Sequence, residues 1–260
     1  MANKERLMSL LTHYLLDTNI SFSRHPLPPS RHPRESGDPE LIYLLDSRFR
    51  GNDGETYNPE NCPPVYAGMT TEETIEKLAD FLVLLLRWNE KFNLTAIIDE
   101  KDAVISHILD SLSIAPFITG NRVIDVGSGA GLPGIPLAIV QPNKQFVLLD
   151  SRAKRTQFLL QTKAALQLEN VSIVNERVEA YKPDTCFDCV ITRAFASLRE
   201  MLNKTHHLCC KQGSFVAMKG LYPEKELSEI PPNFEVKQIK ELKIPDLNAS
   251  RHVAVIHPVS

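Results

Sequence analysis

The stretch Asp125-Val-Gly-Ser-Gly-Ala-Gly-Leu-Pro-Gly134 decides the fold class, because it lies between a short β-prone run and an apolar helical run. Glycines let a loop turn tightly and let its backbone approach a ligand without a Cβ in the way. Backbone N–H groups at the start of the following helix favour a carboxylate or a phosphate. The stretch therefore predicts a ligand-binding loop at the carboxyl end of the first strand of an α/β sheet.

Two kinds of nucleotide fit this loop. It matches G-x-G-x-x-G, the pattern of NAD and FAD sites that is weak on its own, through Gly129, Gly131 and Gly134. It also matches the Asp-x-Gly-x-Gly-x-Gly loop of S-adenosylmethionine (SAM) enzymes, through Asp125 and the glycines that start at Gly127. An acidic residue before the first glycine suits the ammonium of a methionyl group better than a pyrophosphate. Asp150, at the end of the second predicted strand, can accept hydrogen bonds from ribose hydroxyls in both cases.

Strands and helices alternate around this loop. The pattern predicts strands over 122–126, 146–149, 171–174, 189–192, 214–218, 235–242 and 252–256. It predicts helices between them over 133–140, 152–167 and 198–208. Alternation that ends in a strand pair is typical of a doubly wound, mostly parallel sheet with one antiparallel strand, here over 117–260.

The N-terminal part differs in composition. Apolar spacing predicts a helix within 1–23 and a helical cap over 69–116. Residues 24–68 hold eight of the 18 prolines and resemble peptides translated from mobile palindromic repeats of bacterial genomes. We expect a mostly disordered insertion there. The alternative, an RNA-binding arm, is disfavoured because this segment has five arginines but seven acidic residues and is therefore net negative.

Charge and hydropathy exclude several classes. The formal net charge of -3 excludes attachment to nucleic acid by bulk positive charge, so any RNA contact must use a local patch. Apolar runs are too short for a membrane span, and no signal peptide is expected.

Five cysteines, with Cys209 and Cys210 adjacent, make a poor disulfide framework and predict a reducing compartment, the cytoplasm. The Cys186-x-x-Cys189 pair favours a small buried residue at Cys189 over a metal or redox site.

Further blocks extend along the chain in a fixed order. They are Trp88-Asn-Glu-Lys-Phe-Asn-Leu-Thr95, His107-Ile-Leu-Asp110-Ser-Leu, Asp125–Pro136, Leu148-Leu-Asp150-Ser with Lys154-Arg155, Asn170-Val, Arg177-Val-Glu179, Phe187–Leu198, Lys219-Gly and Arg251-His252. With these blocks the sequence resembles the bacterial ribosomal RNA small subunit methyltransferase G (RsmG/GidB) family, almost continuously over 69–258. The insertion is the departure from the family, and it puts the N-terminal packing in doubt.

The resemblance implies a class I SAM-dependent methyltransferase fold with a seven-stranded sheet whose last strand is antiparallel. It implies methylation of N7 of a guanosine in the 530 loop of 16S rRNA, at position 527. By position, the family's SAM contacts fall on Gly127, Leu132, Val178, Glu179 and Arg193. To these the residue pattern adds Asp125, Gly129, Gly131 and Asp150. The partner is 16S rRNA, in the 30S subunit or an assembly intermediate.

The implied chemistry needs no general base. Guanine N7 carries an exposed lone pair, and no proton leaves when it is alkylated. We therefore predict no essential acid or base residue and no metal, with catalysis by in-line positioning of the reacting atoms. Rival functions are a small-molecule methyltransferase, an NAD dehydrogenase and a non-enzymatic RNA-binding module.

Several side chains have two interpretations. Arg193 either contacts SAM or guanine, or pairs with Glu179 or Asp188. Candidate RNA contacts, each equally able to form a solvated face, are Arg152, Lys154, Arg155, Lys219 and Arg251. His107 and Asp110 favour helix-to-loop hydrogen bonding over metal binding, and Trp88 and Phe92 favour the core.

Overall fold

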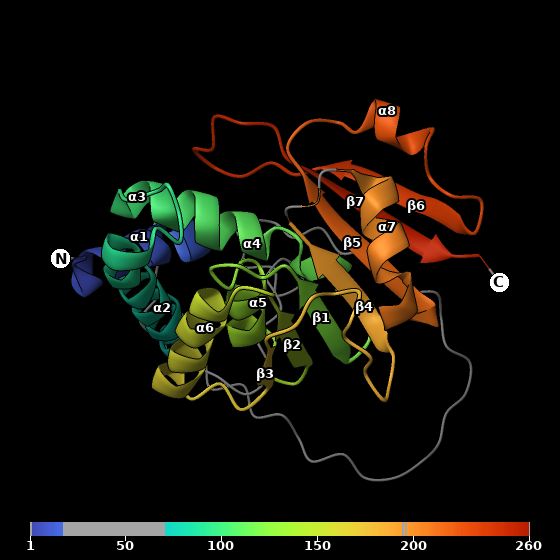
Figure 1. Cartoon of the computed structure of the whole chain (residues 1–260). Helices are drawn as coiled ribbons and strands as arrows, with labels where there is room; N and C mark the ends of the chain where they lie inside the picture. The colour runs from blue at the N-terminus through green and yellow to red at the C-terminus, as the bar shows by residue number, and fades with distance from the viewer. Residues whose placement is uncertain (1, 18–70, 194, 196, 260) are drawn as a thin grey trace, which may run out of the picture.

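Seven strands form one sheet within the part of the chain that the computed structural model describes, namely residues 2–17, 71–193, 195 and 197–259. The predicted insertion over 24–68 lies outside these residues. The strands are β1 (Arg122–Val126), β2 (Gln145–Leu149), β3 (Val171–Val174), β4 (Phe187–Thr192), β5 (Cys209–Lys219), β6 (Phe234–Glu241) and β7 (His252–Pro258). Their order is β3-β2-β1-β4-β5-β7-β6, and β7 runs antiparallel to both of its neighbours (Figure 1). The predicted doubly wound sheet is confirmed.

Helices precede the sheet and alternate with its strands. The N-terminal ones are α1 (Lys4–Thr12), the π-helix η1 (His13–Asp17), α2 (Thr71–Phe92), α3 (Glu100–Ala103), the π-helix η3 (Val104–Leu109), α4 (Asp110–Leu112) and the 3₁₀ turn η4 (Ala115–Phe117). The others are α5 (Gly134–Val140), α6 (Ala153–Leu166), α7 (Leu198–Thr205), the 3₁₀ turn η5 (His206–Leu208) and α8 (Glu224–Leu227). Among the described helices, none is both long and apolar enough to cross a membrane.

Successive side chains of the strands point to opposite faces of the sheet, and each face contributes to its own apolar layer. Val123 of β1 belongs to the layer that α5 and α6 cover, whereas the next residue, Ile124, belongs to the layer that α7 covers. This alternation follows from the strand period of two. Helix α2 packs on α5 and α6, and α1 packs on α2, so the N-terminal helices form an outer layer on one side of the sheet (Figure 1).

The N-terminal segment formed by α1 and η1 is anchored at both ends. Leu7 and Leu11 are fully buried, and Lys4 Nζ lies 2.9 Å from a carboxylate oxygen of Glu76 on α2. The Tyr14 hydroxyl donates a hydrogen bond of 2.6 Å to Asp246, in the loop between β6 and β7. Residues on both sides of the predicted insertion therefore belong to one packed core.

The cysteines correct one sequence-based expectation. Cys186 and Cys210 form a disulfide, so the prediction that the cysteines lack a disulfide framework is wrong for this pair. Adjacent cysteines are no obstacle, because consecutive side chains of a strand point to opposite faces. Cys189 is free and fully buried in β4, as predicted, and burial raises the pKa of its thiol to about 11. Among the described residues, no group of three His, Cys, Asp or Glu side chains is placed to hold a metal ion.

Packing of the N-terminal helices on α6 centres on Phe158. This fully buried ring lies with its centroid 6.5 Å from that of Phe81 and 5.5 Å from that of Trp88. We predict that Phe158→Ala lowers the free energy of unfolding by about 3–5 kcal/mol, because it removes the ring and leaves a cavity. Urea unfolding measures this loss. Leu160→Ala, on the same helix but 55% exposed, is the control and should change stability by less than about 0.5 kcal/mol. Equal losses in both variants would contradict the packing described.

Candidate nucleotide and RNA site

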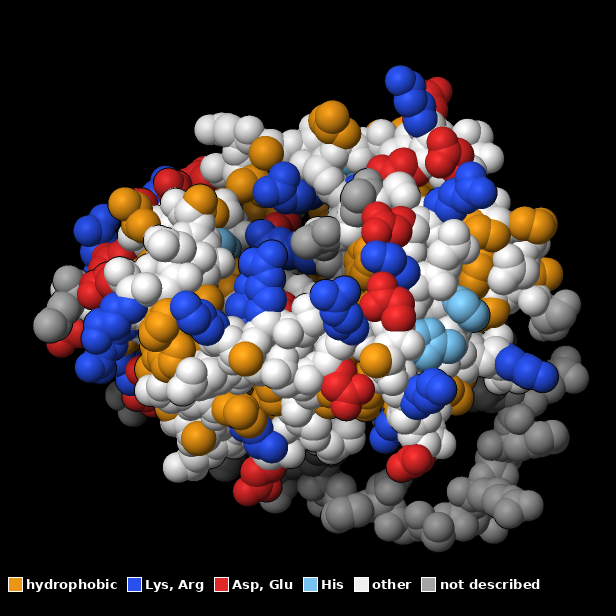
Figure 2. Space-filling model, viewed as in Figure 1, with side chains coloured by type: hydrophobic (Ala, Val, Ile, Leu, Met, Phe, Trp, Pro, Cys, Tyr) orange, Lys and Arg blue, Asp and Glu red, His pale blue; other side chains and the backbone are white. Residues whose placement is uncertain are grey.

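Parallel pairing brings three segments to one edge of the sheet. Asp125 on β1 lies opposite Leu148 on β2 and Ile191 on β4. The carboxyl ends of these strands therefore meet, and the residues that follow them, including Asp150 and Arg193, lie at the same edge. In Figure 2 the surface is hollowed over this edge, with Lys and Arg side chains gathered around the hollow.

The loop after β1 adopts backbone angles that residues with side chains rarely adopt. Gly127, Gly129 and Gly131 adopt φ angles of 75°, 56° and 81°. A Cβ on Gly131 would lie 2.6 Å from the Ile135 side chain, whereas one on Gly127 would meet nothing within 4 Å. Gly131 thus serves close packing, while the space beside Gly127 is open to a ligand.

Two carboxylates fix this loop from beneath and beside it. Asp125 accepts a hydrogen bond of 2.9 Å from the N–H of Gly134, at the start of α5. Asp150 accepts 2.9 Å from the N–H of Gly129 and 2.8 Å from the N–H of Arg152. These bonds use backbone donors that would otherwise lack partners.

Asp125 lies in an unusual environment. The side chain is only 1% exposed, and its Oδ1 has no hydrogen-bond partner among the described residues. Burial raises the pKa of this carboxyl to about 7; the Gly134 N–H opposes the increase and the neighbouring Asp150 adds to it. Asp125 therefore acts as a buried cap of α5, and its direct contact with a methionyl ammonium stays a prediction.

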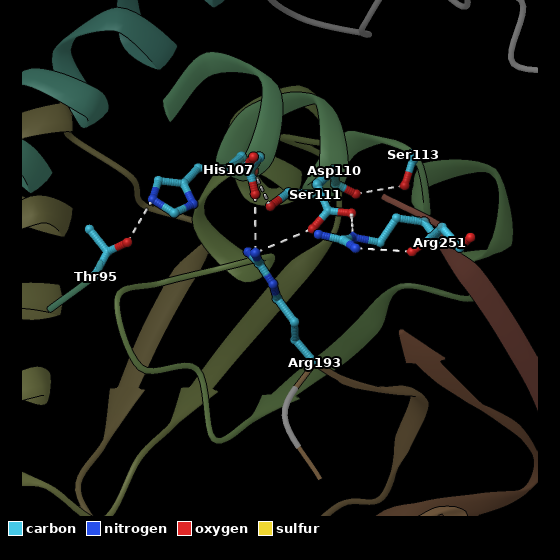
Figure 3. Close-up of polar contacts among 9 residues, drawn as sticks. Thr95, His107, Asp110, Ser111, Ser113, Arg193 and Arg251 are labelled. Atoms are coloured by element: carbon cyan, nitrogen blue, oxygen red, sulfur yellow. Dashed lines mark hydrogen bonds and ion pairs between the residues drawn. The ribbon is translucent and has the colours of Figure 1, made fainter. Parts of the chain in front are cut away.

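Arg193 reaches from the end of β4 to the helical layer (Figure 3). One of its nitrogens, Nη2, lies 3.2 Å from Asp110 Oδ2 and donates 3.1 Å to the carbonyl of Ser106. Arg251, just before β7, donates 3.1 Å to the other oxygen of Asp110. We call these three charged side chains the Asp110 cluster. It ties the N-terminal helices to the carboxyl edge of the sheet.

The alternative interpretation, an ion pair of Arg193 with Glu179 or Asp188, is wrong. Glu179 pairs with Lys204 at 3.5 Å, and Asp188 accepts from the N–H groups of Asn121 and Arg122. The actual partner is Asp110, which sequence spacing does not bring near residue 193.

His107 makes the helix-to-loop bond that its position predicts. Its Nε2 lies 3.0 Å from the hydroxyl of Thr95, and the ring is 3% exposed (Figure 3). Burial, reinforced by the charge of Arg193, lowers the pKa of His107 to about 4, so the ring is neutral at pH 7. It lies on the π-helix η3, a distortion that is frequent at functional sites.

The residues implied for the adenine end are less enclosed. Val178 packs at the margin of the layer under α7, and Glu179 is about half exposed. Leu132, in the glycine loop, is 7% exposed. Leu132 follows β1, and Val178 and Glu179 follow β3, so all three come after strands whose carboxyl ends lie at this edge.

The side chains at this edge fit a nucleoside with a charged tail. Arg193 Nη1 and Asp125 Oδ1 are both buried without hydrogen-bond partners among the described residues. Asp150 keeps acceptor capacity, because a carboxylate offers about four lone-pair positions. Open space beside Gly127 leaves room for the group. These features are compatible with a bound SAM molecule.

The five candidate RNA contacts divide into two groups. Arg155 lies 3.4 Å from Asp150, Lys219 lies 2.8 Å from Glu226, and Arg251 belongs to the Asp110 cluster. By contrast, Arg152 and Lys154 are exposed and have no ion pair among the described residues.

Sequence reasoning also misplaced one aromatic side chain. Phe92 was expected in the core, yet it is 39% exposed at the end of α2. Trp88 packs against the core only in part. Their spacing of four residues on a helix is the same for a core pair and for a surface pair, so the pattern could not separate the two cases.

The raised pKa of Asp125 predicts a pH-dependent stability. Its carboxyl titrates at about 7 in the fold and at an ordinary value near 3.8 when unfolded. This group therefore stabilises the fold fully below about pH 4, and that contribution is lost as the pH rises through 7. Asp125→Asn removes the titration, so the variant should gain stability relative to the wild type between pH 4 and 8.

Urea unfolding over this pH range measures the gain, which should be on the order of 4 kcal/mol because one pKa unit corresponds to about 1.4 kcal/mol. Asp184→Asn, at an exposed position, is the matched control. A difference between Asp125→Asn and the wild type that stays constant with pH would refute the assignment.

Comparisons with known proteins agree with this geometry. The family model for rRNA small subunit methyltransferase G matches residues 74–254. The chain is 49% identical over 194 residues to ribosomal RNA small subunit methyltransferase G of Aeromonas salmonicida (strain A449), an alignment that covers 74% of this chain and 93% of that protein. It is 52% identical over 180 residues to the protein of that name from Hydrogenovibrio crunogenus (strain DSM 25203 / XCL-2), covering 69% of this chain and 83% of that one.

The match spans the glycine loop, Asp150, Arg193 and the Asp110 cluster together. The dinucleotide interpretation of the loop is thereby set aside, and SAM is the cofactor. The chain belongs to the rRNA small subunit methyltransferase G family.

Proposed function

We propose that this methyltransferase transfers the methyl group of SAM to N7 of a guanosine in the 530 loop of 16S rRNA, at position 527. The observation that carries the proposal is the glycine loop held between Asp125 and Asp150, within a chain whose relatives are named ribosomal RNA small subunit methyltransferase G. Beside that loop, Asp150 would hold the ribose, and Gly127 would allow the close approach of the methionyl part.

The reaction at N7 places few demands on acid or base residues. When bound, SAM supplies a sulfonium methyl that the N7 lone pair can attack directly, and no proton has to leave. Burial lowers the pKa of His107 to about 4, which makes its ring a weak base, and both oxygens of Asp110 pair with arginines, so neither side chain is suited to remove a proton. The work of the chain is then to position the guanine in line and to exclude water.

Arg193 is the side chain best placed to meet the guanine or the cofactor. Its Nη2 is engaged by Asp110 and Ser106, whereas Nη1 has no partner among the described residues. Because Asp110 orients the guanidinium, Nη1 is a fixed, buried donor at the carboxyl edge of the sheet. A target base must be unstacked to reach it.

RNA binding would rely on a local patch rather than on net charge. Arg152 and Lys154 are exposed at the start of α6, beside the loop after β2. With a formal net charge of -3, the chain attracts free RNA weakly. We therefore propose a 30S subunit or an assembly intermediate in the cytoplasm as the substrate, in which ribosomal proteins add contacts.

Mapping the modified nucleotide tests the proposed function. Purified protein, SAM and either protein-free 16S rRNA or 30S subunits from cells lacking the gene are incubated, and N7-methylguanosine is located by reduction and aniline cleavage. We expect a single new cleavage in the 530 loop, with faster methylation of the subunits. Methylation at another ring atom or another loop would reject the proposal, and equal rates would reject the preference for the particle.

Asp150→Asn tests the ribose contact. Because the change removes a charged acceptor, we expect SAM to bind about tenfold more weakly or worse. Isothermal titration calorimetry measures the affinity. Glu169→Gln, an exposed change just beyond α6, should leave it unchanged. An affinity of Asp150→Asn within twofold of the wild type would show that the carboxylate does not hold the ribose.

A further inference from the structure

A small surface groove lies beside the N-terminal helices, away from the glycine loop. Its volume is about 330 Å³, at the lower end for ligand pockets. It is lined by Leu84, Arg87, Trp88, Lys91 and Phe92 of α2 and by Gln161 of α6. We call it the aromatic groove. Figure 2 shows hydrophobic side chains over α2 and α6 flanked by Lys and Arg side chains.

The aromatic wall of the groove is rigid. Trp88 and Phe92 lie with their ring centroids 4.9 Å apart and their planes inclined by 33°. Behind them, Phe158 of the core supports Trp88 at 5.5 Å. Phe92 is 39% exposed, so part of its ring is open to solvent while Trp88 packs against it. Such a ring binds a flat group at little cost in conformational entropy.

The charges at the groove are positive and unpaired. Arg87 and Lys91 are exposed one turn apart on α2, and neither has an ion pair among the described residues. Glu90 is the nearest acidic residue in sequence, but it does not line the groove. Aromatic faces beside unpaired cations match a nucleotide, because its base can stack while its phosphate meets the cations.

The groove lies on a path that leads to the site. Gln161 of the groove and Lys154 at the start of α6 are separated by seven residues, so they occupy the same face of the helix about 10 Å apart. The N–H of Arg152, two residues before Lys154, donates to Asp150, which also accepts from the N–H of Gly129 in the glycine loop. An RNA chain that places its guanine at the glycine loop can therefore continue along α6 to the aromatic groove.

We propose that the aromatic groove binds an unpaired nucleotide of the RNA substrate, with the base stacked on Phe92 and Trp88 and the flanking phosphates on Arg87 and Lys91. The inference rests on the proposed function, which it extends by a second RNA contact outside the methyl-transfer site. Single-stranded RNA is the favoured occupant because the groove combines stacking faces with unpaired cations; a peptide would need only the apolar wall.

Binding of the full-length protein to protein-free 16S rRNA tests the proposal. Arg87→Glu/Lys91→Glu should weaken binding about tenfold and flatten the slope of log affinity against log salt by about 1.4, since each phosphate contact on a single strand contributes about 0.7. The matched control is Lys182→Glu/Lys211→Glu, two exposed lysines near the amino ends of β4 and β5. It should weaken binding less than threefold.

Stacking is tested separately at Phe92. Phe92→Ala should weaken binding about tenfold, and Phe92→Trp should restore it, because stacking needs any aromatic face. All of these positions are exposed, and melting temperatures within a few degrees of the wild type establish that the variants fold. SAM affinity should be unchanged in each of them.

Two results would overturn the proposal. One is binding by the groove variants that equals that of the lysine control. The other is a loss that occurs with 30S subunits but not with protein-free rRNA, which would assign the groove to a ribosomal protein. These results are distinguishable from a failure of the proposed function. That failure would be seen as a wild type that does not methylate the 530 loop, whereas the groove is tested by rRNA binding.

Discussion

The site depends on two carboxylates that hold one glycine-rich turn. Asp125 accepts a hydrogen bond from the N–H of Gly134, and Asp150 accepts one from the N–H of Gly129. These two bonds connect the loop both to β1 and to the end of β2. A buried carboxylate is costly unless it is hydrogen-bonded. The loop therefore satisfies the carboxylates while they fix its backbone, and the open space beside Gly127 results from this mutual constraint.

A second constraint makes the N-terminal helices part of the site. The side chain of Asp110 is 1% exposed and lies between Arg193 and Arg251. Arg193 directly follows β4, and Arg251 directly precedes β7. Burial raises the pKa of Asp110, and the two arginines oppose that increase. Because one carboxylate orients Arg193, movement of the helical layer would also move a donor at the carboxyl edge of the sheet.

Local patterns predicted what is local in the structure. Strand and helix alternation, the glycine loop and a helix-to-loop hydrogen bond of His107 follow from patterns within short segments, whereas the partner of that bond, Thr95, was not predicted. The partner of Arg193 and the Cys186–Cys210 disulfide depend on which strands are neighbours and on their register, and no short segment encodes that. Exposure of Phe92 likewise depends on where α2 ends relative to α6.

A crystal structure with S-adenosylhomocysteine, the demethylated form of the cofactor, would show directly how the loop and Asp150 hold the nucleoside. We expect the ribose hydroxyls within hydrogen-bond distance of Asp150 and the amino acid tail against the backbone at Gly127. Electron density for the nucleoside at any other edge of the sheet, or a tail that does not contact the glycine loop, would contradict it.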